Sequence, residues 1–159
     1  MPVNMRDNVI IEKGIARVSE DKARSLAVHR LREDDILLPR RGELDRRALV
    51  RDRNVGWICG TGSVRVRLRP DVSPIAVLHA LASAHSLRWL NANAVGTTMP
   101  NVNRTIVGNI PIALPPPKDL EETLTLLTHA ESEISRLHER FACAAHVRRT
   151  FFDRALERA

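Results

Sequence analysis

No proline or glycine interrupts the chain between Asp119 and Ala159. Apolar side chains recur there at alternating spacings of three and four residues, which is the heptad period of a helix that packs against another helix. Acidic residues stand at the start of this segment and arginines at its end, as the dipole of a single helix favours. At 1.5 Å per residue, the pattern predicts one helix roughly 60 Å long, which is longer than a small domain is wide.

The apolar heptad positions of this helix form one seam, and we expect the seam to contact a second helix. The residues that we assign to this interface are Leu120, Leu127, Ile134, Leu137, Phe141 and Phe151. One apolar seam is half of a coiled coil, so we predict that two copies of the chain associate through residues 120–151. The alternative is a helix that packs back on its own domain.

A proline-rich segment at residues 111–117 divides the chain into two regions of opposite charge. Before Asp119 there are 16 arginines and 3 lysines against 11 acidic residues, a net charge of +8. From Asp119 onward there are 6 arginines and 8 acidic residues, a net charge of −2. Because attraction to a polyanion depends on where charge lies, we predict a DNA-binding domain at 1–117 and a helix for dimerisation or subunit docking at 118–159.

The first region has the patterns of short strands and helices, so we assign the chain to the α+β class, with a small mixed sheet and helix domain followed by one long coiled-coil helix. The expected elements are strands at 35–39, 55–58 and 64–68, helices at 74–81 and 101–109, and an extended piece at 110–114. Ser73 is expected to cap the first of these helices, with Pro74 in its first turn, and Asn101 to cap the second.

Arginine supplies nearly all of the positive charge, and it is densest between residues 40 and 69. Its planar guanidinium suits bidentate contacts to phosphate and to guanine. The DNA contacts that we predict in this stretch are Arg40, Arg41, Arg46, Arg47, Arg65 and Arg67. Two alternatives stay open: a GC-rich coding sequence enriches arginine without a functional reason, and local ion pairs, for example with Asp45, would make this stretch a solvated surface.

The polar segment at 95–104 is a second candidate contact region, because its hydroxyl and amide groups can bond to phosphates or to adenine edges. The residues that we predict to contact DNA here are Thr97, Thr98, Asn101, Asn103 and Arg104. The alternative is a capped connection between helices, in which threonine and asparagine are ordinary residues.

The chain shows no pattern of a metal, cofactor or catalytic site. No two of its histidines have the spacing of a zinc-binding helix. The stretch at 60–63 (GTGS) is followed by a strand pattern rather than a helix, so we predict a tight turn and not a phosphate loop. Cys59, directly before it, is interpreted as a small buried apolar side chain.

Several classes of protein are disfavoured by composition. No apolar run is long enough to span a membrane, and the N-terminal residues do not have the pattern of a secretory signal. Cys59 and Cys143 are the only cysteines, and two free thiols suit a reducing cytoplasm, where we expect the protein. Only two tryptophans and three phenylalanines are present, which disfavours a single-strand or RNA binder that works by base stacking.

In this order, the pieces resemble the DNA specificity subunit of Type I restriction-modification systems. The match begins at 31–37 (LREDDIL) with Arg41 and Gly42 after it, where the family has a GDIL strand and a following glycine. It continues through 72–74 (VSP) and 96–98 (GTT), and it ends at 110–116 (IPIALPP) before the long helix.

This sequence departs from the family pattern at three places. Asp34 stands where the family has glycine, and residues 118–122 (KDLEE) stand where it usually has a Glu-Gln pair. The family's opening segment is expected to be missing before Val3. One recognition domain is present where the family has two.

The resemblance implies a non-catalytic subunit that recognises double-stranded DNA and directs methyltransferase and endonuclease subunits. Its implied partners are double-stranded DNA, a DNA adenine methyltransferase subunit that docks on the helix, and a second specificity half, either another copy or a different chain. The alternative is an assembly remnant that docks a modification subunit through its helix without reading DNA.

Overall fold

The computed structural model describes residues 2–96 and 99–156, and in its long C-terminal helix the side chains at 117, 135, 138, 139, 142 and 145–156 are not described. The chain divides into two compact units, Met1–Leu114 and Pro115–Ala159. The strands of the first unit are β1 (Met5–Arg6), β2 (Val9–Ile10), β3 (Ile36–Pro39), β4 (Ala48–Leu49) and β5 (Ser63–Val66). Its α-helices are α1 (Glu20–Ser25), α2 (Pro74–Ala82), α3 (Ala84–Asn93) and α4 (Arg104–Gly108), and it has short 3-10 helices at Pro2–Asn4, Ala27–His29 and Asp52–Asn54. The mixed class predicted from sequence is confirmed.

The centre of the first unit is an antiparallel sheet with the strand order β4-β3-β5. Ile36 of β3 pairs with Leu49 on one side and with Val66 on the other. All four residues of β3 are buried. A strand that is covered on both faces is expected to read as a continuous apolar run, and this is why 35–39 was recognisable in the sequence.

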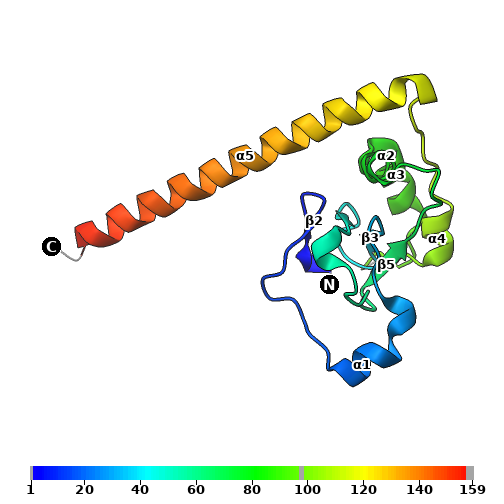
Figure 1. Ribbon diagram of the computed structural model, residues 1–159, viewed down its shortest axis with the longest axis horizontal. Coiled ribbons are helices and arrows are strands. Elements are labelled where there is room, and N and C mark those ends of the chain that lie inside the picture. The colour runs from blue at the N-terminus through cyan, green and yellow to red at the C-terminus, as the bar shows by residue number, and fades with distance from the viewer. Residues whose placement is uncertain (1, 97–98, 157–159) are drawn as a thin grey trace. The chain divides into compact units, whose positions relative to one another are not determined.

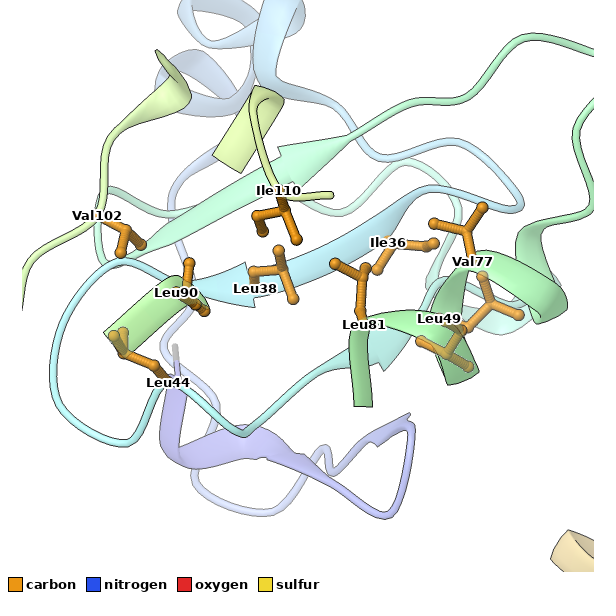
Figure 2. Close-up of a cluster of buried hydrophobic side chains, with 10 residues drawn as sticks. Ile36, Leu38, Leu44, Leu49, Val77, Leu81, Leu90, Val102 and Ile110 are labelled. Carbon is orange, nitrogen blue, oxygen red and sulfur yellow. The ribbon is translucent and has the colours of Figure 1, made fainter. Parts of the chain in front are cut away.

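The two faces of this sheet have separate apolar cores. Ile36 and Leu38 of β3 pack with Leu81 of α2 and Leu90 of α3, as Figure 2 shows. On the other face, Leu37 belongs to a second cluster, whose buried members are Met5, Ile10, Leu31, Leu37, Ala48 and Val50. The alternation of side chains along β3 therefore holds the α2–α3 pair on one face and the N-terminal β1–β2 hairpin on the other.

The β1–β2 hairpin is an element that the sequence reading missed. Asp7 and Asn8 join the two strands, and both have positive φ angles, 50° and 63°. Two such residues form the type of turn that matches the twist of a hairpin, so the Asp-Asn pair was a usable signal. Asn4 holds the hairpin to the following segment, because its buried side-chain amide donates to the carbonyl oxygens of Ile11 and Lys13.

Three of the expected elements agree closely with the structure. The strand predicted at 64–68 is β5, and the strand at 35–39 is β3. The helix predicted at 74–81 is α2, and the Ser73 hydroxyl accepts a hydrogen bond from the Ala76 amide, 3.3 Å away, as the expected cap. The glycine stretch at 60–63 is a turn, closed by a hydrogen bond from the Ser63 amide to the Gly60 carbonyl.

Two expectations were wrong. Residues 55–58 do not form a strand: the chain leaves the 3-10 helix Asp52–Asn54 through a turn at Gly56, where φ is +84°, and Ile58 makes only an isolated bridge. The short helix does not start at Asn101. It is α4, and its cap is Asn103, since the backbone of Asn101 is already paired with Val95 in the loop before it.

The structure explains how Asp34 can stand where the family that this sequence resembles has glycine. Asp34 has a φ angle of +64°, in the left-handed region that glycine adopts without cost. Aspartate tolerates this region better than most residues. The second glycine of the match, Gly42, also has a positive φ angle, +82°. Both positions of the resemblance therefore coincide with a backbone requirement.

Replacing Asp34 by glycine is expected to raise the free energy of unfolding by about 0.5 kcal/mol. The conformational energy that glycine relieves in the folded chain is larger than the entropy that glycine adds to the unfolded chain. Asp34→Val should lower it by about 1–2 kcal/mol, since a β-branched residue does not fit this region. Urea denaturation of both variants measures the two effects. Equal stability of the glycine and valine variants would contradict this account.

The described part of the second unit contains one helix, α5 (Pro117–Leu156), of 40 residues, drawn in yellow to red in Figure 1. The long C-terminal helix predicted from sequence is confirmed. Its first turn contains Asp119, the charge that the helix dipole favours there. None of the helices in the described ranges is long and apolar enough to cross a membrane.

Candidate nucleic-acid interface

The structure brings the two predicted contact segments together, although they are about sixty residues apart in the chain. At the end of β3, the Arg40 amide donates to the Gly62 carbonyl, and the Arg40 carbonyl accepts from the Val102 amide. The donor–acceptor distance is 2.9 Å in both hydrogen bonds. Arg41 forms an isolated antiparallel bridge with Asn101. The 40–42 segment therefore lies between the 60–62 turn and the 101–104 segment that leads into α4. We call these three segments the β3 end surface.

The predicted arginines fall into two groups by what their side chains bond to. Those whose guanidinium groups donate hydrogen bonds within the chain are Arg46, Arg47, Arg65 and Arg67. Within the described part of the chain, the guanidinium groups of Arg40, Arg41 and Arg104 have no hydrogen bond or ion pair. Arg41 and Arg104 are exposed, and Arg40 is half-buried. Among the predicted arginines, the three whose guanidinium groups are available to a ligand therefore all belong to the β3 end surface.

Arg67 is held by Asp35, which is buried at the start of β3. Its Nε and Nη2 atoms donate to the two carboxylate oxygens of Asp35, each at a distance of 2.7 Å. The Arg32 amide donates to the same carboxylate at a distance of 2.8 Å, and the Arg65 Nε atom lies 4.0 Å from that carboxylate. The hydrogen bond to Asp35 raises the pKa of Arg67 above its ordinary value. Such a fork bonded to a buried carboxylate is a structural contact.

Arg65 and Arg46 also tie segments of the first unit together. Arg65 Nη1 donates to the carbonyl oxygens of Val28 and Arg30, 3.2 Å and 2.8 Å away. Arg46 forms an ion pair with Glu43, and its Nη1 donates to the Met5 carbonyl in the N-terminal hairpin. Changing these residues would remove a fold contact together with a charge. They are thus less suited than Arg40 or Arg104 for testing DNA contact.

The two asparagines of the second segment serve the backbone. Asn103 Oδ1 accepts a hydrogen bond from the Ile106 amide, 2.9 Å away, and so caps α4. The Asn101 backbone donates to and accepts from Val95, which closes the loop between them. The capped connection that the sequence left as an alternative is therefore present, beside Arg104. Thr97 and Thr98, also predicted to contact DNA, lie outside the described residues.

Cys59 lies at the edge of the second core cluster, beside Trp57. Its burial raises the pKa of the thiol, and the positive charge of Arg65 opposes that shift. A raised pKa makes the thiolate scarcer, which is the opposite of what a catalytic nucleophile needs. Within the described residues, no group of three or more His, Cys, Asp or Glu side chains is placed to hold a metal ion.

The predicted helix interface can be followed over most of its length. Ile134, Leu137 and Phe141 of α5 are exposed, with Phe141 at 71% of its full accessible surface, whereas Leu120 and Leu127 are half-buried. The side chain of Phe151 is not among those described. Apolar residues of this size are seldom left in water along one helix face, which is consistent with a surface that has a partner.

The chain was compared with protein families, with curated proteins and with solved structures. No family model matches the chain, and no curated protein matches it. The crystal structure of an HsdS subunit from Thermoanaerobacter tengcongensis is similar, with a TM-score of 0.53 and 25% sequence identity. The match covers 68% of this chain but only 29% of that subunit. The chain therefore has a fold like that of part of a Type I restriction-modification specificity subunit.

Proposed function

We propose that this chain recognises double-stranded DNA as a non-catalytic, half-size specificity subunit of a Type I restriction-modification system. The observation that carries the proposal is the β3 end surface. Two segments that sequence analysis selected separately lie side by side there, and they present the guanidinium groups of Arg40, Arg41 and Arg104 without internal partners in the described structure. The likeness to an HsdS subunit supports the same function.

The proposed DNA contact is expected to depend on salt. Wild-type affinity for duplex DNA should fall steeply as salt rises, because each arginine–phosphate contact releases condensed counterions. In the double variant Arg40→Ala/Arg104→Ala, affinity should fall about tenfold or more, and the slope of log K against log salt should flatten by about two. Fluorescence anisotropy with a labelled duplex, over a salt titration, measures both.

A matched control removes the same charge elsewhere. Arg17 and Arg24 are exposed and form surface ion pairs with Glu12 and with Asp21, away from the β3 end surface. The double variant Arg17→Ala/Arg24→Ala should keep most of the affinity and nearly the full salt slope. Equal losses in the two double variants would show attraction to net charge alone, and they would contradict the proposed surface.

We infer a second role for α5, as the contact with another specificity half. Residues 118–139 have six acidic and two basic residues, whereas residues 140–159 have five arginines and two acidic residues. In an antiparallel pair of helices, the acidic half of one copy would lie beside the basic half of the other. The charge distribution therefore favours the antiparallel orientation, and the apolar seam would supply the contact, with a methyltransferase subunit as a further partner of the helix.

A non-DNA-reading assembly factor is the second candidate, and the exposed α5 seam is the observation that favours it. Such a factor would bind a modification subunit without affinity for duplex DNA. Mixing the full chain with a Type I methyltransferase subunit, with and without duplex DNA, separates the two. If the chain binds the methyltransferase subunit but the complex takes up no duplex DNA, the assembly factor is favoured. A complex of the chain, the subunit and duplex DNA would favour DNA recognition.

A further inference from the structure

The residue types at the β3 end surface differ in which base edge they can read. An amide side chain reads adenine by presenting its oxygen and its NH₂ group together to N7 and N6. A guanidinium reads guanine by presenting two N–H groups to O6 and N7. Which base is read therefore depends on which side chains have both of their atoms available.

Neither asparagine of this surface presents a complete amide edge. Asn103 Oδ1 accepts a hydrogen bond from the Ile106 amide, which holds this side chain against the first turn of α4. Asn101 Oδ1 is shielded from solvent and has no hydrogen-bond partner in the described part of the chain. A bidentate contact to adenine would therefore require Asn103 to turn away from the helix cap or Asn101 Oδ1 to become accessible.

Arg41 has the complementary properties. Its side chain is exposed and its guanidinium has no partner in the described ranges, so both N–H groups of the fork are available. Its backbone is held by the bridge with Asn101, and the next residue, Gly42, turns the chain away with a φ of +82°. A side chain that reads a nucleobase needs such a fixed backbone, because discrimination between bases is lost when the contact is loosely placed.

We propose that Arg41 reads a guanine in the major groove of the recognised duplex, while Arg40 and Arg104 contact phosphates. This inference rests on the proposed function, and it narrows the substrate to a half-site that contains a G·C pair. The arginine is then a specificity-determining residue, and the asparagines beside it position the segments that hold it.

The test begins with the full-length chain and a pool of duplexes with a randomised central stretch. Wild-type protein should select a site with an invariant G·C pair. Replacing that guanine by 7-deazaguanine, which lacks the N7 acceptor, should weaken wild-type binding about tenfold. Arg41→Ala should bind the guanine and 7-deazaguanine duplexes equally. Arg41→Lys should keep its affinity for mixed-sequence DNA and discriminate less strongly against 7-deazaguanine than the wild type, since lysine retains the charge without the planar fork.

The outcomes separate this inference from the function on which it rests. A selected site without an invariant G·C pair, or an Arg41→Ala variant that still discriminates against 7-deazaguanine, would overturn the role of Arg41 and leave DNA recognition standing. Failure of the wild type to enrich any duplex would overturn the proposed function itself. Arg17→Ala, which removes one exposed charge, should discriminate like the wild type, and unchanged thermal melting of Arg41→Ala would show that its loss is one of recognition.

Discussion

Asp35→Ala is expected to lower the free energy of unfolding of the first unit by about 2–3 kcal/mol. The carboxylate of Asp35 is buried, and it accepts two hydrogen bonds from Arg67 and one from the Arg32 amide. Its removal takes away the acceptor of all three hydrogen bonds and breaks the contact between the start of β3 and the segment after β5. Since a domain of this size is stable by about 5–15 kcal/mol, this loss is a large fraction of the total stability.

Urea denaturation followed by circular dichroism measures this loss. Asp71→Ala is the matched control, because Asp71 also pairs with an arginine, Arg69, but both side chains are exposed. An exposed pair is worth about 0–1 kcal/mol, so the control should melt close to the wild type. If Asp35→Ala were no less stable than Asp71→Ala, the buried pair would not be holding the sheet. Arg67→Met gives a second measurement, and it should be destabilised in the same direction.

The second large effect is expected on self-association. Ile134→Lys places a charge in the middle of the proposed α5 seam, where Ile134 is exposed in the single chain. Burying an unpaired lysine between two helices costs far more than the apolar contact that it replaces, so the variant should be monomeric at tens of micromolar, where the wild type is expected to be a dimer. Sedimentation equilibrium of both proteins measures the change.

Thr128→Lys is the control for this experiment. It adds the same charge to the same helix, but Thr128 is exposed and lies outside the apolar heptad positions. It should remain dimeric. A monomeric wild type would contradict self-association through α5, and it would leave a different specificity half or a modification subunit as the partner. Equal dissociation by both lysines would indicate general charge repulsion instead of a seam.

The sequence was sufficient for elements whose signal is local. The long helix follows from the absence of proline and glycine after Asp119, and α2 follows from Ser73 and Pro74 at its start. The strand β3 was visible because both of its faces are covered. Elements that depend on turns were less visible. The hairpin at Asp7 and Asn8 was missed, and 55–58 was wrongly predicted as a strand, because the chain turns there at Gly56.

The candidate surface divides in the same way. Its two segments were selected from the sequence by residue type, through arginine at 40–41 and polar groups at 101–104. The sequence did not indicate that these segments are neighbours, since the pairing of Arg41 with Asn101 joins residues far apart in the chain. It also did not indicate that Arg67, chosen for its charge, is bonded to a buried carboxylate, because charge density along a sequence carries no information on burial.

The sequence by itself therefore determined the class of the fold, the length of the helix and the location of the positive charge, because these follow from periodicity and composition. Only the tertiary structure decided which arginines are available to a ligand. Hydrogen bonding within the folded chain uses Arg46, Arg65 and Arg67, whereas Arg40, Arg41 and Arg104 meet at one end of the sheet with no such partner in the described residues. The physical reason is that a guanidinium already bonded to a carboxylate or carbonyl oxygen must give up that bond before it can bind a phosphate or a base.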